Sequence, residues 1–167
     1  MRIHINIGSN KDREKNIKKA IVGIKKYFHN TEFSSVYETE AFGFKGDNFY
    51  NIGVNAITDK SLLETFKILR CLEKNIGRIR NTEKFSSREI DLDLILFGDL
   101  VNKENNIPRD DILKFPFVLA PLSEIMPQDL HPEIKKNFFD LWEDHQRKYD
   151  PKYSKLENSK YLNPKIL

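Results

Sequence analysis

Two aspartates near the start of an apolar run have the types and spacing to bind metal ions. The run from Arg88 to Phe97 reads Arg-Glu-Ile-Asp-Leu-Asp-Leu-Ile-Leu-Phe, a pattern typical of a buried strand. Because side chains alternate along a strand, Asp91 and Asp93 share one face and lie roughly 7 Å apart. Their oxygens suit Mg2+ ions that carry phosphate. The alternative is a strand end at which both acids simply reach solvent.

A basic segment leads directly into this acid pair. Residues 77–88 lack helical or strand periodicity and contain Arg78, Arg80, Lys84 and Arg88. Guanidinium groups bind phosphate oxygens in pairs, so we predict that a triphosphate lies across the segment and the metal. The chain contains neither Gly-x-x-x-x-Gly-Lys-Ser/Thr nor Gly-x-Gly-x-x-Gly, and side chains must therefore hold the phosphates. The alternative is a solvated charged loop.

Two further polar residues lie where apolar ones are expected. Glu73 is four residues after Leu69 and seven after Phe66, on the inward side of a predicted helix. It needs a partner there, either a nearby arginine or a ligand. Asn51 lies inside a predicted strand, where its amide can pair with the edge of a flat heterocycle. A satisfied structural asparagine explains Asn51 equally well.

The elements that position these residues follow from hydrophobic spacing. Strands are predicted over residues 2–7, 34–39, 49–58 and 88–97. A first helix follows the Gly8-Ser9-Asn10 turn, which supplies its N-cap or, alternatively, an anion site. A second helix starts at the Ser61–Glu64 capping box and stops at Gly77. Shorter helices are predicted near residue 120 and over residues 134–147, with Trp142 in the core. The long segment 40–48 between two strands is of a kind that is usually functional.

Composition narrows the class of protein. The chain has 167 residues, 39% of them hydrophobic and 32% charged, which indicates one globular domain rather than a disordered chain. No apolar run reaches the length of a bilayer span, no leader pattern precedes the first strand, and we expect a cytoplasmic protein without membrane contact. A net charge of +3 gives no reason to expect nucleic acid. One cysteine and four histidines offer neither a disulfide nor a zinc-ligand spacing.

Five short motifs occur in an informative order. They are Gly8-Ser9-Asn10, Ser35-Val36-Tyr37-Glu38-Thr39, Phe49-Tyr50-Asn51, Glu73-x-x-x-Gly77-Arg78-x-Arg80 and Arg88-x-x-Asp91-Leu92-Asp93. Together they resemble the 6-hydroxymethyl-7,8-dihydropterin pyrophosphokinase family of folate synthesis, over most of residues 1–127. The resemblance implies an α+β fold with a ferredoxin-like antiparallel sheet covered by helices. We expect a catalytic domain over residues 1–148 and a loosely ordered tail over residues 149–167.

The resemblance also implies residue roles by matching position. Asp91 and Asp93 would bind two Mg2+ ions that bridge the phosphates of ATP, and with Arg78 and Arg88 they would form the catalytic set. The implied ATP-binding residues are Glu73, Arg78, Arg80, Phe85, Arg88, the backbone of Leu94, and Arg109. The implied pterin-binding residues are Thr39, Glu40, Phe42, Phe49, Asn51 and Phe117, of which the two phenylalanines Phe49 and Phe117 would stack on either side of the pterin.

The activity implied is transfer of the terminal pyrophosphoryl group of ATP to the pterin hydroxymethyl group, with release of AMP. The expected partners are these two small molecules, with no obligate protein partner. The chain lacks a Ser/His/Asp or Cys/His constellation, which agrees with direct attack and no covalent protein intermediate.

The chain departs from the family pattern at four places. Thr39-Glu40-Ala41 lacks the proline of Thr-x-Pro and so loses its restriction of φ. Phe85-Ser86-Ser87 replaces a tryptophan followed by Gly-Pro. Arg109 stands in place of a phosphate-contacting histidine, and Phe115 in place of an arginine, with Lys114 beside it.

Two other classes of function stay open at this point. Ferredoxin-like sheets also carry RNA-recognition domains, although the aromatic-rich RNP1 pattern is absent here. The replacements at Arg109 and Phe115 also allow a degenerate family member that binds pterin without catalysis.

Overall fold

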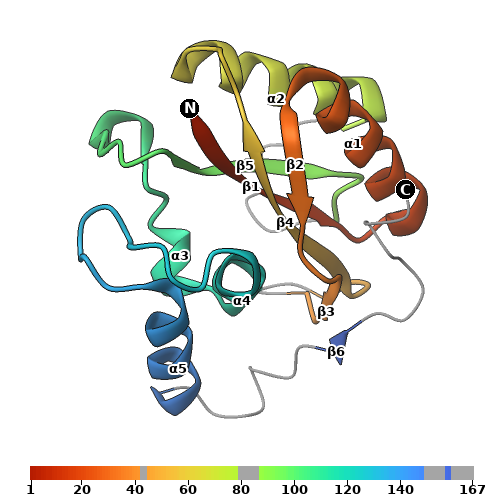
Figure 1. Cartoon of the computed structure of the whole chain (residues 1–167). Helices are drawn as coiled ribbons and strands as arrows, with labels where there is room; N and C mark the ends of the chain where they lie inside the picture. The colour runs from red at the N-terminus through yellow and green to blue at the C-terminus, as the bar shows by residue number, and fades with distance from the viewer. Residues whose placement is uncertain (42–44, 79–86, 149–156, 159–167) are drawn as a thin grey trace.

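The computed structural model in Figure 1 describes residues 1–41, 45–78, 87–148 and 157–158. An antiparallel sheet forms its middle layer. Helices α1 (Arg13–Tyr27) and α2 (Leu62–Ile76) cover one face of the sheet. Helix α4 (Pro116–Ile125) lies on the other face, with α5 (Phe138–Lys148) packed against it. The predicted α+β architecture is confirmed.

Among the described residues the sheet has six strands, in the order β5-β1-β4-β3-β6, and β2 pairs with β4. The strands are β1 (Arg2–Ser9), β2 (His29–Phe33), β3 (Tyr37–Thr39), β4 (Phe49–Ile57), β5 (Asp91–Phe97) and β6 (Glu157–Asn158). The 3-10 turn η1 (Lys103–Asn105) and the short helix α3 (Asp111–Lys114) connect β5 to α4. In the part of the chain that the structure describes, no helix is long and apolar enough to cross a membrane.

One face of the sheet is apolar and packs under α1 and α2. Its residues come from alternate positions of β1 and from the inward stripes of the two helices, as their spacing predicts. The central members, each no more than 2% exposed, are Ile3, Ile5, Ile7, Ile17, Ile21, Ile24 and Leu69. This layer is the main hydrophobic core.

Helix α2 begins and ends as the sequence predicts. The Ser61 Oγ accepts a hydrogen bond from the Glu64 N–H at 3.3 Å, and the Glu64 carboxylate accepts one from the Ser61 N–H at 2.9 Å. The helix stops at Gly77, whose φ of 116° is favourable for glycine and costly for other residues. The end of α2 therefore delivers the chain to Arg78 in a defined direction.

The prediction of one strand over residues 34–39 was wrong. The structure instead has β2 directly after α1 and a short β3 from Tyr37, both paired with β4. Between them Ser34 replaces regular pairing, because its N–H donates to the Gly53 carbonyl and its Oγ accepts from the Gly53 N–H, each at 2.9 Å. The polar β2 sequence His-Asn-Thr-Glu gave no alternating apolar signal.

Two helix starts also differ from their predictions. The first helix begins at Arg13 after Asp12, not at the Gly8-Ser9-Asn10 turn, because the Ser9 and Asn10 side chains bind other segments. The last helix begins at Phe138 rather than at residue 134. Asn137 accounts for this start, since its Oδ1 accepts from the Asp140 N–H at 2.7 Å as an N-cap does.

Of the predicted C-terminal tail, the structure describes residues 157–158. They form β6, which pairs with Tyr37 and Glu38 at the outer edge of β3. The remaining residues of the tail, 149–156 and 159–167, lie outside the described residues, and their loose order stays a prediction.

The other face of the sheet is polar, which is unusual for a surface that a helix covers in part. Strand register aligns Asp91 with Gly8 and Asn51, then Asp93 with Asn6 and Gly53, and then His4 with Asn55. We call these eight residues the polar face. They alternate with the apolar residues of the main core, so the same three strands supply both surfaces.

Helix α4 packs against the polar face through two contacts with β4. A Cβ added to Gly53 would lie 2.9 Å from the Pro121 Cβ, so glycine is required for this close approach. Asn55 donates from its Nδ2 to the Ile125 carbonyl at the end of α4, at 3.2 Å. Its Oδ1 pairs with His4 Nδ1 at 2.8 Å, which makes the His4 nitrogen the donor.

His4 should make the stability of the fold depend on pH. It is fully buried, and burial lowers its pKa from 6.5 to about 4. The unfolded chain therefore binds more protons between these pH values, and the free energy of unfolding falls as pH drops through that window. We expect His4 to contribute a loss on the order of 3 kcal/mol between pH 7 and pH 4.

Urea unfolding of wild type, His4→Phe and His29→Phe at several pH values measures this loss. His29 is exposed and serves as the control, so His29→Phe should keep the wild-type pH slope. His4→Phe should be less stable at pH 7, because Asn55 loses its partner, but should lose less on acidification. An identical slope in His4→Phe and wild type would contradict this assignment.

Candidate active site

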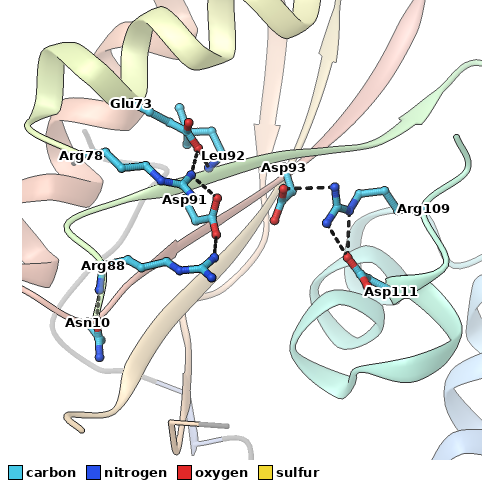
Figure 2. Close-up of polar contacts among 9 residues, drawn as sticks. All are labelled: Asn10, Glu73, Arg78, Arg88, Asp91, Leu92, Asp93, Arg109 and Asp111. Atoms are coloured by element: carbon cyan, nitrogen blue, oxygen red, sulfur yellow. Dashed lines mark hydrogen bonds and ion pairs between the residues drawn. The ribbon is translucent and has the colours of Figure 1, made fainter. Parts of the chain in front are cut away.

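Asp91 and Asp93 open β5 with their side chains on the polar face, as the alternation predicts. Figure 2 shows that each carboxylate has its own arginine partners, Arg78 and Arg88 at Asp91 and Arg109 at Asp93. The acid pair and the basic residues flanking it therefore form one cluster.

Asp91 lies between two guanidinium groups. Arg78 binds its Oδ1 and Arg88 binds its Oδ2, and the Asp91 side chain is 15% exposed. The two arginines come from the ends of the segment between α2 and β5, so the acid holds both ends of that segment at the sheet. The Arg78 side chain is also 15% exposed. The alternative of a solvated charged loop therefore does not apply to Arg78.

Glu73 has the arginine partner that its buried position requires. It is 3% exposed, and its Oε1 binds Arg78 and also accepts the Leu92 N–H at 2.9 Å. This carboxylate thus joins α2 to β5 and orients Arg78 toward Asp91. Of the two partners predicted for Glu73, the nearby arginine is confirmed, and contact of Glu73 with ATP stays a prediction.

Asp93 shares Arg109 with a second acid. The Arg109 Nη1 lies 3.3 Å from Asp93 Oδ1, while Asp111 Oδ2 accepts from Arg109 Nε at 2.8 Å and lies 2.6 Å from Nη2. Burial and the charge of Asp91 raise the pKa of Asp93 to about 7, against the opposing effect of Arg109. The arginine therefore compensates the acid pair only in part.

The donor set at this position fits a hard divalent cation. Two carboxylates on one face are joined by Asn6, next to Asp93 in register, whose buried Oδ1 has no hydrogen-bond partner. All three offer oxygen, which Mg2+ prefers. Among the described residues no group of three or more acidic, histidine or cysteine side chains gathers around one point. Water and substrate phosphates would complete such a site, as is usual for Mg2+.

Asn10 joins the segments on either side of the cluster, a role that the sequence did not reveal. Its Oδ1 accepts the Arg88 N–H at 2.7 Å. Its Nδ2 donates to the Asp47 carbonyl at 3.1 Å and to Ser87 Oγ at 3.3 Å. The segment before β4 and the segment before β5 are thus both held to the turn after β1. The Gly-Ser-Asn motif is the available signal in the sequence, but its pattern predicts a helix cap.

Asn51 lies across the polar face from Asp91. It is 3% exposed, and its Nδ2 donates to Thr39 Oγ1 at 2.9 Å, which joins β4 to β3. Gly8 separates the two residues, because a Cβ added there would lie 3.4 Å from Asn51 Oδ1 and 4.0 Å from Asp91 Cβ. The floor between the amide and the acid therefore carries no side chain.

Phe117 lies in the first turn of α4, and Phe49 opens β4. The Phe117 ring stacks on Phe115, with centroids 5.0 Å apart and planes 15° from parallel. Phe115 and Phe117 therefore form an aromatic pair, which we call the aromatic wall. Lys114 next to it pairs with Asp110 at 3.1 Å and is exposed.

The remaining predicted site residues have simple placements. Leu94 is buried in the middle of β5, Thr39 is half-buried at the end of β3, and Glu40 is exposed just beyond it. Phe42, Arg80 and Phe85 lie outside the described residues. The structure adds Asn6, Gly8, Asn10 and Asp111 to the set. The sequence-based prediction assigns none of them to the ATP or pterin site, although Gly8 and Asn10 belong to the turn expected to cap the first helix or to bind an anion.

Comparisons with known proteins agree with this geometry. Residues 4–127 match the family model of 7,8-dihydro-6-hydroxymethylpterin-pyrophosphokinase. The chain is 34% identical over 138 residues to the 2-amino-4-hydroxy-6-hydroxymethyldihydropteridine pyrophosphokinase of Aquifex aeolicus, covering 80% of this chain and 86% of that protein. It is 38% identical over 112 residues to the protein of the same name from Synechocystis, covering 66% of this chain and 57% of that one.

Solved structures share the fold. An HPPK-DHPS structure in complex with substrates has a TM-score of 0.70 at 13% identity, and the match covers 94% of this chain and 45% of that one. Wild-type HPPK-DHPS of Plasmodium falciparum also has a TM-score of 0.70, at 15% identity, covering 92% of this chain and 45% of that one. The chain thus spans about half the length of these HPPK-DHPS chains. On the strength of the family model and the Aquifex relative, the chain belongs to the 7,8-dihydro-6-hydroxymethylpterin-pyrophosphokinase family.

Proposed function

We propose that this chain transfers the terminal pyrophosphoryl group of ATP to the hydroxymethyl group of 6-hydroxymethyl-7,8-dihydropterin, releasing AMP, as a step of folate synthesis. The observation that carries the proposal is the arrangement of the polar face. An acid pair surrounded by arginines occupies one side, and the Asn51 amide lies on the other, with only Gly8 between them. A triphosphate and a flat heterocycle can meet there at close range.

The phosphates of ATP belong on the arginine side. Arg78, Arg88 and Arg109 face the acid pair, and phosphate oxygens would take over part of their hydrogen bonding. Arg80, Phe85, Glu73 and the Leu94 backbone complete the ATP site that we propose. Four carboxylates already face three guanidinium groups in the cluster, so a bound triphosphate requires added positive charge.

Two Mg2+ ions held by Asp91 and Asp93 would supply that charge and polarise the phosphoryl oxygens as Lewis acids. The Asn6 oxygen, which lacks a hydrogen-bond partner, lies beside Asp93 in register and offers an acceptor for ordered water.

The pterin belongs over β4 and β3. Asn51 and Thr39 would bind its edge, Phe49 and Phe117 would stack on its two faces, and Glu40 and Phe42 complete the pterin site that we propose. The Asn51–Thr39 hydrogen bond fixes the amide before substrate arrives, which lowers the entropy cost of recognition.

The residues of the chain act by positioning and by charge. The hydroxymethyl oxygen attacks the β-phosphorus, the bond to the α,β-bridging oxygen breaks, and AMP leaves with that oxygen while the hydroxyl proton is released. Arg78, Arg88 and Arg109 stabilise the negative charge that moves onto the leaving oxygen. No protein nucleophile takes part.

The test is incubation of the chain with ATP, Mg2+ and 6-hydroxymethyl-7,8-dihydropterin, with AMP and the pterin diphosphate separated by chromatography. We expect equal amounts of the two products. Pterin binding without AMP release would identify a binding protein instead. Salt-dependent binding of single-stranded RNA without ATP consumption would identify an RNA-binding module.

Asp93→Asn should lower kcat by about a hundredfold or more, because it removes a metal ligand while leaving the shape of the side chain unchanged. Steady-state AMP release measures this change. Asp99→Asn is the matched control, since Asp99 is exposed just after the other end of β5. Retained turnover in a folded Asp93→Asn variant would count heavily against the metal role.

Gly8→Val should impair the reaction by filling the floor between the two substrates. A Cβ at this position would make ordinary contacts of 3.4 to 4.0 Å, so we expect Gly8→Ala to fold as wild type does, and circular dichroism checks the fold of Gly8→Val. Substrates would be held farther apart, and we expect kcat/KM for the pterin to fall about tenfold or more, with Gly8→Ala intermediate. Wild-type kinetics in Gly8→Val would show that the substrates do not meet over this residue.

A further inference from the structure

Glu124, in the last turn of α4, binds the segment that leads into β3. Its Oε1 and Oε2 each lie 3.0 Å from the Ser35 N–H nitrogen, Oε1 accepts from Ser35 Oγ at 2.9 Å, and Oε2 accepts from Tyr37 Oη at 2.7 Å. One carboxylate thus receives hydrogen bonds from three groups within residues 35–37.

The position of this acid along the helix is unfavourable in itself. A negative charge near a helix C-terminus opposes the macrodipole, and the last turn of α4 contains no basic residue to balance it. Burial and the neighbouring Glu124 carboxylate raise the pKa of Tyr37 above its ordinary value. The phenol therefore stays protonated and donates a hydrogen bond to Glu124. The hydrogen bonds to residues 35–37 explain why an acid is stable there.

The two sides of this contact carry different parts of the proposed pterin site. Phe117 precedes Glu124 by seven residues, two helical turns, so the two side chains lie on the same side of α4. Tyr37 is the register partner of Asn51, and Thr39 further along β3 receives the Asn51 hydrogen bond. Glu124 therefore connects α4, which carries Phe117, to β3, which carries Thr39.

Two other contacts between α4 and the sheet act on β4. Pro121 rests on Gly53, and the Ile125 carbonyl receives the Asn55 amide. These contacts fix the height of α4 above β4 and leave the short strand β3 to be held separately. The three-residue β3 pairs with β4 and otherwise with the two residues of β6, so the Glu124 contact carries much of its attachment on the side of α4.

We propose that Glu124 is a positioning residue for the pterin: through Ser35 and Tyr37 it sets the spacing between Phe117 on α4 and the Asn51–Thr39 pair on the sheet. This inference rests on the proposed function. Glu124 itself touches neither substrate. Its effect should appear in pterin affinity, because the proposed pterin site lies between α4 and β3. It should not appear in ATP affinity, because the arginines are bound by other acids, namely Glu73, Asp91, Asp93 and Asp111.

The test measures binding by calorimetry. The protein is first saturated with Mg2+ and a non-hydrolysable ATP analogue, and 6-hydroxymethylpterin is then titrated in; the analogue is titrated in a separate experiment. We expect Glu124→Ala to weaken pterin binding about tenfold, the scale of one lost hydrogen bond to a charged group. Binding of the analogue should stay within about twofold of wild type, a change of less than 0.5 kcal/mol on the usual conversion.

Two further variants separate positioning from general stability. Glu124→Gln keeps the length of the side chain and one acceptor oxygen, and should restore most of the pterin affinity. Tyr37→Phe should weaken pterin binding less than Glu124→Ala, and adding it to Glu124→Ala should cost little more, because the shared hydrogen bond is already lost. Glu104→Ala, at an exposed glutamate of η1, is the control and should bind as wild type does.

The outcomes distinguish this inference from the proposed function. If wild type releases AMP and Glu124→Ala binds pterin as tightly as wild type while unfolding at a lower temperature, Glu124 is only structural and the inference is wrong. Equal weakening of pterin and analogue binding would also overturn it. If wild type neither binds pterin nor releases AMP, the proposed function itself fails.

Discussion

Mutual repulsion between Asp91 and Asp93 is the constraint around which this site is built. Two carboxylates on one face of a strand, partly withdrawn from water, are stable only with positive charge close by. Arg78 and Arg88 meet this need for Asp91, and Arg109 meets it in part for Asp93. These ion pairs hold Arg78, Arg88 and Arg109 beside the first residues of β5. Removing one partner of such a pair generally costs more than the pair contributes, because a buried charge is left alone.

The sheet carries the hydrophobic core on one face and the site on the other, because alternate residues of the same strands point to opposite faces. Ile3, Ile5 and Ile7 of β1 face α1 and α2 and form the main core, whereas His4, Asn6 and Gly8 face the site. A shift of one residue in register would exchange the two sets, which would bury the polar groups and expose the isoleucines. Folding and function therefore require the same register, and the apolar face secures the placement of the polar one.

The sequence predicts those parts of the molecule that local patterns determine. The capping box and Gly77 define α2, the isoleucine alternation defines β1, and the Asp-x-Asp spacing places both acids on one face. Local patterns could not reveal β2, because its polar residues lie at an edge and are held by pairing with β4.

Several contacts that the sequence does not predict join residues far apart in the chain. Asn10 binds Asp47 and Ser87, and Glu124 binds Ser35, across separations that no periodicity reports. The residue type of Asn10 is also uninformative, because an asparagine after a strand is usually a cap or turn residue. Positions of this kind can be identified only when the fold brings their partners together.

Arg109 shows how the site accommodates a permanent positive charge beside the acid pair. An arginine is always charged, so Arg109 alone would add a full positive charge beside Asp93. Asp111 lies two residues away and takes two of the guanidinium nitrogens, leaving Nη1 for Asp93. The pair of Arg109 and Asp111 thus brings no net charge while still presenting a donor to the acid. The raised pKa of Asp93 agrees with this account, because Arg109 opposes the shift while Asp111 adds to it.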